Sequence, residues 1–513
     1  MPVKMHHDTI VIGSGIGGLA CASALAKYGH RALVLEQHHI AGGLTSTFSR
    51  KGFTWDVGIH YLGDMGPEGQ ARRILDWLSN NTIKMAPVGS VYDIVHFPDD
   101  FKIVFESPAE ALRQNLKDKF PQSSGEIDVF FSLLGQVARG SSAPFQLHVL
   151  PRFLALIYSL WTAGRIRTWW GRTIDEVLGK MISDQRLRSV LAAQWGDHGG
   201  RPAEGSFAMH AMIMNHYLEG AFYPAGGART FADSLIPTIT NAGGEVRVKS
   251  PVKAILVTNG KATGVMLEDG TEHHAPRVVS AVGARDTVQQ LLPTEMRDSA
   301  WAQEILSFKP SSSHLCLYLG FEGDIRAAGA TSANHWFYET WDTNSAAWDN
   351  PAGTDAPRLF VSFPSLKDPM HEAGEKQKHT GEILTWVDWE VFSKWEKSRR
   401  GDRPEGYREL KKLIEEKMLA QFKRYFPEMA SLITYHELST PLSMVHYVGR
   451  QQGASYGLDV TPRRFLSRAL NVRTPIKGLY LAGQDVVTPG ITGAMMGGIL
   501  AAAVIDPRIF RHL

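Results

Sequence analysis

The chain has 513 residues, of which 43% are hydrophobic and 21% are charged, and its formal net charge is +2. This length is more than one hydrophobic core usually supports, so we expect two or three domains. The balanced charge gives no reason to expect a nucleic-acid partner. The only cysteines, Cys21 and Cys316, exclude a disulfide framework and a cysteine metal site, and we expect no metal.

Three features of the sequence bear on localisation. Met1–His7 leads directly into the first predicted strand, which leaves no room for a signal peptide. Two cysteines within apolar segments are typical of a reducing compartment. No stretch approaches the ~18–20 unbroken apolar residues of a membrane-spanning helix. We therefore expect a cytoplasmic protein, either free in solution or peripherally attached to a membrane surface.

A strand, a helix and a second strand are predicted at the N-terminus, over Thr9–Ile12, Ile16–Ala26 and Ala32–Leu35. Glu36 follows the second strand at about the spacing expected of an acid that binds a ribose hydroxyl. The turn between the first strand and the helix fits the G-x-G-x-x-G pattern with Gly13, Gly15 and Gly18. In that pattern the glycines allow a tight turn, close approach to a pyrophosphate and close helix–strand packing, and the helix N-terminus attracts the phosphates. The stretch predicts a dinucleotide site.

Two further segments favour FAD over a nicotinamide dinucleotide. The glycine doublet Gly42–Gly43 lies just beyond Glu36, where a flavin enzyme of the glutathione-reductase superfold places its ribityl chain and pyrophosphate. Near the C-terminus, the predicted strand within 478–485 ends at Asp485, and a glycine-rich helix begins after Pro489. The acid can accept a hydrogen bond from a ribityl hydroxyl, and the helix N-terminus can stabilise negative charge on the reduced flavin. The residues predicted to hold FAD are Gly13, Gly15, Gly18, Glu36, Gln37, Gly42, Gly43, Leu44, Val252, Gly483, Asp485, Ile491, Thr492 and Ala494.

The fold class predicted is α/β, with a glutathione-reductase-type FAD-binding Rossmann domain built from discontinuous segments and a substrate domain with an antiparallel sheet and a helical part. We assign residues 1–75, 225–300 and 470–513 to the FAD domain, and 76–224 and 301–469 to the substrate domain. A β-hairpin is predicted over Val91–Phe97 and Phe101–Phe105, and the antiparallel strands lie between Ser311 and Glu390.

Residues 149–170 combine an apolar and aromatic centre with basic residues near both ends. One interpretation is a helix that docks on a membrane surface over the mouth of a lipid-substrate tunnel. The alternative is a buried core helix, which suits the ~10–14 apolar residues equally well.

The chain resembles the phytoene desaturase and carotenoid isomerase group of FAD oxidoreductases. The motifs that carry the resemblance are 13–18, 33–37, 41–43 and 481–485. Within that group, Gly58–Gly63, Gly220–Gly227 and Gly453–Gly457 resemble the retinol saturase branch. The sequence Gly-Ala-Arg at 227–229 departs from the branch pattern of Gly-Ser-Ser, which bears on the substrate more than on the fold.

The resemblance implies an FAD-dependent saturase that reduces a carbon–carbon double bond of a hydrophobic polyene, such as a retinoid or a carotenoid-like lipid, by hydride transfer at flavin N5. The alternatives are a carotenoid desaturase or a redox-neutral polyene isomerase, an amine oxidase-like flavoenzyme, and a non-catalytic flavin-bound subunit. The chain has no second G-x-G-x-x-G unit, so NAD(P)H docks transiently at the flavin or another donor supplies the electrons.

His60, Tyr61 and Tyr456 are the catalytic candidates, because motifs near the flavin-binding segments carry them. The alternative for His60 is a structural histidine that fixes its loop, and the alternative for Tyr456 is packing beside the flavin. Asp197 and His198 form either a polar pair at a tunnel end or a turn cap.

Overall fold

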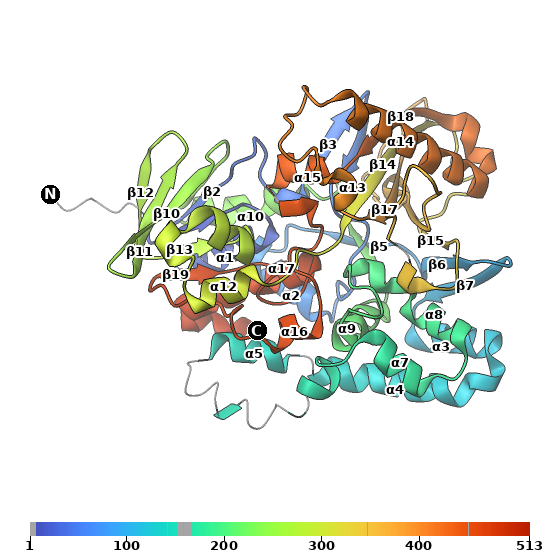
Figure 1. Cartoon of the computed structure of the whole chain (residues 1–513), viewed down its shortest axis with the longest axis horizontal. Helices are drawn as coiled ribbons and strands as arrows, with labels where there is room; N and C mark the ends of the chain where they lie inside the picture. The colour runs from blue at the N-terminus through green and yellow to red at the C-terminus, as the bar shows by residue number, and fades with distance from the viewer. Residues whose placement is uncertain are drawn as a thin grey trace.

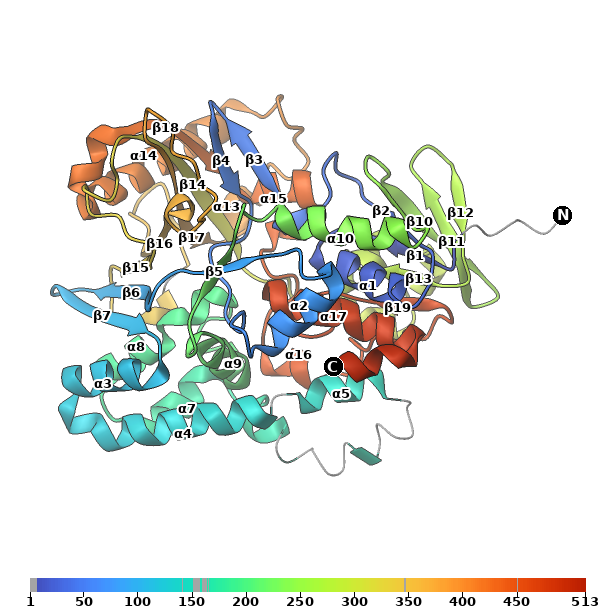
Figure 2. The same ribbon diagram turned by 180° about the vertical axis from the view of Figure 1, so that it is seen from behind.

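The computed structural model describes residues 7–140, 142–150, 157–158, 164, 166–345, 347–449 and 451–513. Its two main sheets lie on either side of the centre of the molecule, with helices between and below them in the view of Figure 1. Figure 2 shows the reverse face, where the helices α2 (Gln70–Ser79) and α10 (Thr230–Asn241) lie in front of the centre of the molecule.

The first sheet is parallel throughout and draws its strands from three distant parts of the chain. Its strands β1 (Thr9–Ile12) and β2 (Ala32–Leu35) are wholly buried and, apart from Thr9, apolar, as is typical of parallel strands covered on both faces. The strand order is β19 (Leu479–Leu481), β13 (Val278–Ser280), β1 (Thr9–Ile12), β2 (Ala32–Leu35) and β9 (Glu245–Arg247).

Two buried helices, α1 (Ile16–Ala26) and α17 (Gly490–Ile505), pack against each other beside this sheet. Glycines set how closely they approach. A Cβ atom added at Gly498 would lie 2.0 Å from the carbonyl oxygen of Gly17, and one added at Gly497 would lie 2.1 Å from that of Gly483. The contact brings the first dinucleotide-binding helix against the C-terminal segment, so the two predicted cofactor motifs meet.

An antiparallel three-stranded sheet extends from the parallel one at the left edge of Figure 1. Turns at Asn259–Gly260 and at Gly270 join its strands, and all three residues adopt positive φ angles. The strands are β10 (Val252–Thr258), β11 (Lys261–Leu267) and β12 (Glu272–His274).

The second main sheet has seven strands and is mixed. Its centre is the long antiparallel pair β14–β17, in which Ser313 faces Val387 and Glu322 faces Lys378. The hairpin β6–β7 (residues 91–106) joins this sheet through a parallel pairing of β6 with β15. The order is β18 (Ile433–Ser439), β14 (Ser313–Glu322), β17 (Lys378–Val387), β16 (Arg358–Ser362), β15 (Asn334–Tyr338), β6 (Val91–Phe97) and β7 (Phe101–Glu106).

Short two-stranded sheets and helices complete the fold. The short sheets pair β3 (Thr47–Arg50) with β4 (Phe53–Asp56) and β5 (Met85–Pro87) with β8 (Phe222–Pro224). The helical part at the lower right of Figure 1 holds α3 (Ala109–Lys119), α4 (Ser124–Gly140), α7 (Ile174–Met181), α8 (Gln185–Ala192) and α9 (Phe207–Tyr217). The other helices are α5 (Ala143–Val149), α11 (Ala284–Asp286), α12 (Ala300–Leu306), α13 (Glu390–Ser393), α14 (Glu405–Tyr425), α15 (Pro441–Val448) and α16 (Pro462–Leu466).

The architecture has the predicted α/β class, with a parallel sheet and a separate, largely antiparallel one. The predicted hairpin pairs as expected, but it extends the second sheet through a parallel neighbour, which the sequence pattern did not indicate. Most of the segment 149–170 lies outside the described residues, and the membrane-docking interpretation stays a prediction. Among the described helices, none is long and apolar enough to cross a membrane.

Two large hydrophobic cores underlie these parts. One core joins the parallel sheet to the helical part, from Ile10 in β1 to Leu112 in α3 and Leu187 in α8. The other lies between the seven-stranded sheet and α14, and it includes Leu317 and Phe422. We retain the sequence-based boundaries of the FAD and substrate domains as a proposal, because the parallel sheet draws its strands from 1–75, 225–300 and 470–513.

Candidate active site

The turn between β1 and α1 is shaped to approach a ligand at one glycine and to pack tightly at another. A Cβ atom at Gly18 would lie 2.0 Å from the carbonyl oxygen of Gly13, so the helix and the strand touch there. A Cβ atom at Gly15 would meet nothing within 4 Å. Gly15 precedes the first turn of α1, and no side chain caps that helix start. The free N–H groups and the open space beside them fit a pyrophosphate.

Glu36 lies at the end of β2, directly beside this turn. Its Oε2 accepts hydrogen bonds from the backbone N–H of Ser14 at 3.0 Å and from the Ser14 hydroxyl at 2.6 Å. Its Oε1 accepts one from the backbone N–H of His38 at 2.8 Å. Each carboxylate oxygen has two lone-pair sites, so these contacts orient the group and leave acceptor capacity for a ribose hydroxyl.

The start of α17 supplies the second half of the cradle. The Asp485 carboxyl is buried and is held by the backbone N–H groups of Ala284 at 2.8 Å and Leu458 at 3.1 Å. No side chain caps α17, and the buried hydroxyl of Thr492 has no hydrogen-bond partner among the described residues. Ile491, Thr492 and Ala494 are half-buried within a helix that is otherwise mostly buried. An uncapped helix start with an unpartnered hydroxyl fits a bound polar ring system.

The remaining predicted cofactor residues occupy different surroundings. Gly42 and Gly43 lie against Gly15, since Gly42 forms a bridge with it and a Cβ at Gly43 would lie 3.1 Å from its Cα. Leu44 packs against Gly58. The exposed Gln37 points toward Gly449. Val252 begins β10 and is half-buried, and Gly483 is buried with a positive φ angle beside α17. We propose that the group close to Gly15 holds the cofactor, and that Gln37 contributes least.

A group of ionisable side chains, here called the buried polar cluster, lies between the loop after β4 and the seven-stranded sheet. Its members are His60, Tyr61, Asp93, Asp197, Lys367 and Glu382. His60 Nδ1 lies 2.8 Å from Glu382 Oε2. Lys367 Nζ donates to the His60 carbonyl oxygen at 2.8 Å, to the Ser362 hydroxyl at 2.7 Å and to the Asn334 side-chain oxygen.

Burial sets the protonation of the His60–Glu382–Lys367 group. It raises the pKa of Glu382 to about 8, although Lys367 opposes the shift, and it lowers the pKa of His60 to about 3. It also lowers the pKa of Lys367 to about 7, against the pull of the surrounding carboxyls. Neutral forms are favoured in a dry interior because isolated charges lose hydration there. Near neutral pH, His60 and Glu382 therefore meet as uncharged groups.

Glu382→Gln is expected to change how stability depends on pH. The pKa of Glu382 is raised from 4.5 to about 8 in the folded protein. The stability contributed by its bound proton is therefore complete below about pH 4.5 and is lost as the pH rises through about 8. As the pH rises over this window, the unfolding free energy of the native protein should fall relative to that of Glu382→Gln by several kcal/mol. The expected slope is about 1.4 kcal/mol per pH unit. Urea unfolding at about pH 5 and pH 8 measures it.

The exposed acid Glu375 provides the control for this measurement. Glu375→Gln should follow the native protein at both pH values. Parallel unfolding free energies for the native protein and Glu382→Gln across the window would contradict the assignment of a protonated Glu382.

Tyr61 joins two acids. Its hydroxyl lies 2.9 Å from Asp93 Oδ2 and 2.7 Å from Asp197 Oδ2, and its ring stacks on Tyr217 with the centroids 4.3 Å apart. Asp93 also accepts hydrogen bonds from Gln194 at 2.7 Å and Asn334 at 3.1 Å. Asp197 is thus directed at Tyr61 and does not pair with the side chain that follows it.

His198 takes a separate role. Its Nδ1 accepts the backbone N–H of Gly200 at 3.2 Å, as a turn cap does, and its Nε2 lies 3.2 Å from His210 Nδ1. Of the two interpretations of this dipeptide, the turn cap describes His198, and neither describes Asp197.

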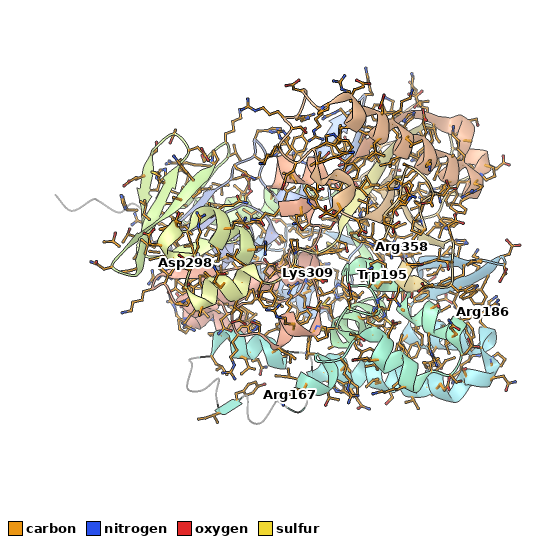
Figure 3. All side chains as sticks on the ribbon, in the orientation of Figure 1. Arg167, Arg186, Trp195, Asp298, Lys309 and Arg358 are labelled. Atoms are coloured by element: carbon orange, nitrogen blue, oxygen red, sulfur yellow. The ribbon has the colours of Figure 1, made fainter. Side chains whose placement is uncertain are left out.

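A buried cation lies beside the buried polar cluster. Arg358 is 1% exposed, and its guanidinium carbon lies 4.0 Å from the centre of the Trp195 ring. Trp336, Tyr338 and Trp386 surround it at 5.6 to 5.8 Å. Figure 3 shows Arg358 and Trp195 together between the helical part and the seven-stranded sheet. The cation–π contacts replace part of the hydration that the guanidinium loses.

Tyr456 lies across from this group. Its ring is 5.8 Å from that of Trp386, and a Cβ atom at Gly199 would lie 2.8 Å from it. Its backbone N–H donates to the Ser311 hydroxyl at 2.8 Å. Tyr456 is half-buried, and its neighbour Gly457 touches Asp485. The structure thus brings Tyr456 close to the second half of the FAD cradle.

Sequence reasoning missed half of the buried polar cluster, and it missed Arg358 beside it. Asp93, Glu382 and Lys367 come from the seven-stranded sheet and its connections, and Arg358 begins β16. A usable signal was present, since each carries a charge within or next to an apolar strand. Charged residues are seldom buried unless they are paired, which makes such positions candidates.

The two uncapped helix starts, the acid beside the glycine turn and the second sheet define the class of protein. It is an FAD-dependent oxidoreductase with a dinucleotide-binding sheet assembled from separated segments. The chain belongs to the flavin containing amine oxidoreductase family, whose sequence model matches residues 16–506. The predicted cofactor, FAD, and the predicted fold class are confirmed.

Individual relatives narrow this placement. The all-trans-retinol 13,14-reductase of Danio rerio is 33% identical over 97% of this chain and 86% of its own length. The chloroplastic prolycopene isomerase of Daucus carota is 26% identical over 97% of this chain and 80% of its own. The predicted resemblance to the retinol saturase branch is confirmed. Cyclohexylamine oxidase from Brevibacterium oxydans shares the fold, with a TM-score of 0.63 at 17% identity over 98% of this chain and 100% of that one.

Proposed function

We propose that this protein reduces a carbon–carbon double bond of a hydrophobic polyene, a retinoid or a carotenoid-like lipid, using FAD. Support comes from the 33% identity to all-trans-retinol 13,14-reductase along nearly the whole chain. The second candidate is a desaturation or a redox-neutral isomerisation of a polyene, which the similarity to prolycopene isomerase favours. Both act on a neutral, apolar substrate.

The position of Arg358 carries the argument against an amine substrate. Four aromatic rings form a cage of the kind that binds cationic amines, but the guanidinium of Arg358 already fills it. A second cation would meet this positive charge in a low-dielectric interior, where repulsion is strong. The site therefore favours an uncharged substrate over an amine.

FAD, when bound, supplies or accepts the hydride. The protein has to exclude water, hold the alkene and move one proton at the neighbouring carbon. The His60 side chain is 19% exposed, and its Nδ1 lies 2.8 Å from Glu382 Oε2. Tyr61 orients the acids beside it, and Tyr456 lies near the second half of the FAD cradle.

Anaerobic mixing of the dithionite-reduced protein with all-trans-retinol tests the proposed function. Flavin reoxidation together with loss of one double bond is the expected result. Isomerised polyene with the flavin still reduced would assign the isomerase instead. Reduction of the oxidised flavin by amines, with no response to polyenes, would contradict both polyene functions.

His60→Ala is expected to retain FAD and to lower polyene turnover by about tenfold to a hundredfold, because it removes the candidate proton-transfer group whose Nδ1 lies 2.8 Å from Glu382. The His60→Gln variant keeps a polar group of similar reach and should lose less. Flavin absorbance of the purified variants and single-turnover rates measure the two effects. Unchanged turnover in His60→Ala would assign His60 the structural role instead.

A further inference from the structure

The Tyr61 hydroxyl makes more contacts than its single hydrogen can serve as donor. It lies within hydrogen-bond distance of Asp93 Oδ2 and Asp197 Oδ2 at the same time. An ionised carboxylate only accepts hydrogen bonds, so with both acids ionised one of these contacts would place two oxygens together without a proton. One of the two acids must therefore carry a hydrogen that it donates to the Tyr61 oxygen.

The other contacts of the pair show which acid that is. Asp93 accepts hydrogen bonds from the amide groups of Gln194 and Asn334 in addition to Tyr61, as an ionised carboxylate does. Burial raises the pKa of Asp93 as well, but these donors oppose that shift. The contact of Asp197 to Tyr61 is the one side-chain hydrogen bond that Asp197 makes among the described residues. The hydrogen therefore lies on Asp197, and the Tyr61 hydroxyl donates to Asp93.

We propose that Asp197 is a carboxylic acid kept protonated by its burial beside Asp93, and that it donates the proton to the substrate carbon next to the one that receives the hydride. The role rests on the proposed reduction of a polyene. One C=C π bond is lost, one C–H bond forms with the hydride of reduced FAD and one with the Asp197 proton. The hydride carries two electrons from the flavin to the substrate, and a proton from water restores Asp197.

Asp197 is placed to reach a substrate. It is the one residue of 191–200 that is not buried, although Tyr61, which it contacts, and Asp93 on the other side of the Tyr61 hydroxyl are 6% and 0% exposed. Asp197 thus keeps an accessible side within an otherwise buried segment. Burial raises the pKa of Asp197 well above its usual range, and the charge of Asp93 adds to the shift.

Other titratable groups face the pair from the elements packed around it. Arg358 on β16 and Lys367 after β16 oppose the rise in the Asp197 pKa. Four tyrosines lie in the field of the acids, namely Tyr92 on β6, Tyr217 on α9, Tyr338 on β15 and Tyr456. Burial raises the pKa of each of these tyrosines, so they stay neutral where Asp197 titrates, and the two cations do not reverse the direction set by burial and Asp93.

Infrared spectroscopy of the FAD-loaded protein tests the protonation without turnover. The native-minus-Asp197→Asn difference spectrum at neutral pH should contain the C=O stretch of a protonated carboxylic acid, and Asp197→Glu should shift this band rather than remove it. Asp118→Asn, a surface variant on α3, should leave the band unchanged. Glu382 contributes equally to each spectrum and cancels. A difference spectrum without this band would overturn the proposal, and Asp197→Glu keeps the test available where the Asn variant does not fold.

Single-turnover oxidation of the reduced protein by a polyene tests the proton transfer. The native rate should fall as the pH rises through the Asp197 pKa, which gives the rate profile a falling limb at high pH. Asp197→Asn should be slower by about 100-fold or more and should lack this limb. Asp93→Asn removes a neighbouring negative charge and should move the limb to lower pH. A native rate that Asp197→Asn reproduces at every pH would overturn the role. If the native protein does not react with polyenes, the proposed function is contradicted. The infrared band still decides whether Asp197 is protonated.

Discussion

Gly15→Ala is expected to leave the fold intact while it weakens FAD binding by about tenfold to a hundredfold. The added methyl group meets no protein atom within 4 Å, so the apoprotein accommodates it. It would project into the space beside the uncapped start of α1, where the pyrophosphate is proposed to lie. A methyl group forced into a packed contact costs about 1–3 kcal/mol, which corresponds to that range of affinity. Fluorescence titration of the apoprotein with FAD measures the change.

Gly18→Ala tests the same motif at the position that packs. Its Cβ would lie 2.0 Å from a backbone oxygen that cannot move aside cheaply, so this variant should lose about 1–3 kcal/mol of stability or more. Gly179→Ala in α7 is the control, because its Cβ meets nothing within 4 Å and alanine is the better helix former by about 1 kcal/mol. Equal FAD affinity in Gly15→Ala and the native protein would place the pyrophosphate elsewhere.

The cofactor end of the protein could be predicted because its determinants are local. A four-residue strand with three apolar side chains, a glycine turn and a helix follow one another within 9–26, and the structure shows the elements at the bounds expected from the sequence. The signal from the C-terminus is also local, since the glycines of α17 indicate close packing wherever its partner lies. What the sequence could not show was that this partner is α1.

The site of the chemistry could not be predicted in the same way, because its members meet only through the sheet. Asp93 and Asn334 come together because β6 pairs in parallel with β15, and that pairing joins segments about 240 positions apart. Likewise, Glu382 reaches His60 across more than 300 positions. Each strand pattern indicates a buried face but not its neighbour, and a shift by one residue would turn Asp93 to the other face.

Tyr61→Phe is expected to separate the hydrogen-bonding role of this residue from its packing role. The phenyl ring can keep the stack on Tyr217, and FAD should remain bound because Tyr61 is not part of the Gly15 and Thr492 cradle. The loss of a buried hydroxyl that serves two acids should lower the unfolding free energy by about 1.5–3 kcal/mol. Tyr435→Phe, which removes a hydroxyl bonded to Glu437 at the far edge of the sheet, is the matched control.

The pH profile of Tyr61→Phe provides the sharper measurement. Once Asp197 has lost its proton, the Tyr61 hydroxyl can donate to it and stabilise the ionised form. Removal of the hydroxyl should therefore raise the Asp197 pKa further and move the upper limb of the turnover profile to higher pH. Asp93→Asn should move the same limb in the opposite direction. A weaker acid transfers its proton more slowly, so turnover below the limb should fall by about tenfold to a hundredfold. Shifts in the same direction for both variants would show that a group other than Asp197 controls the limb, because the hydroxyl and the carboxylate act on its proton with opposite signs.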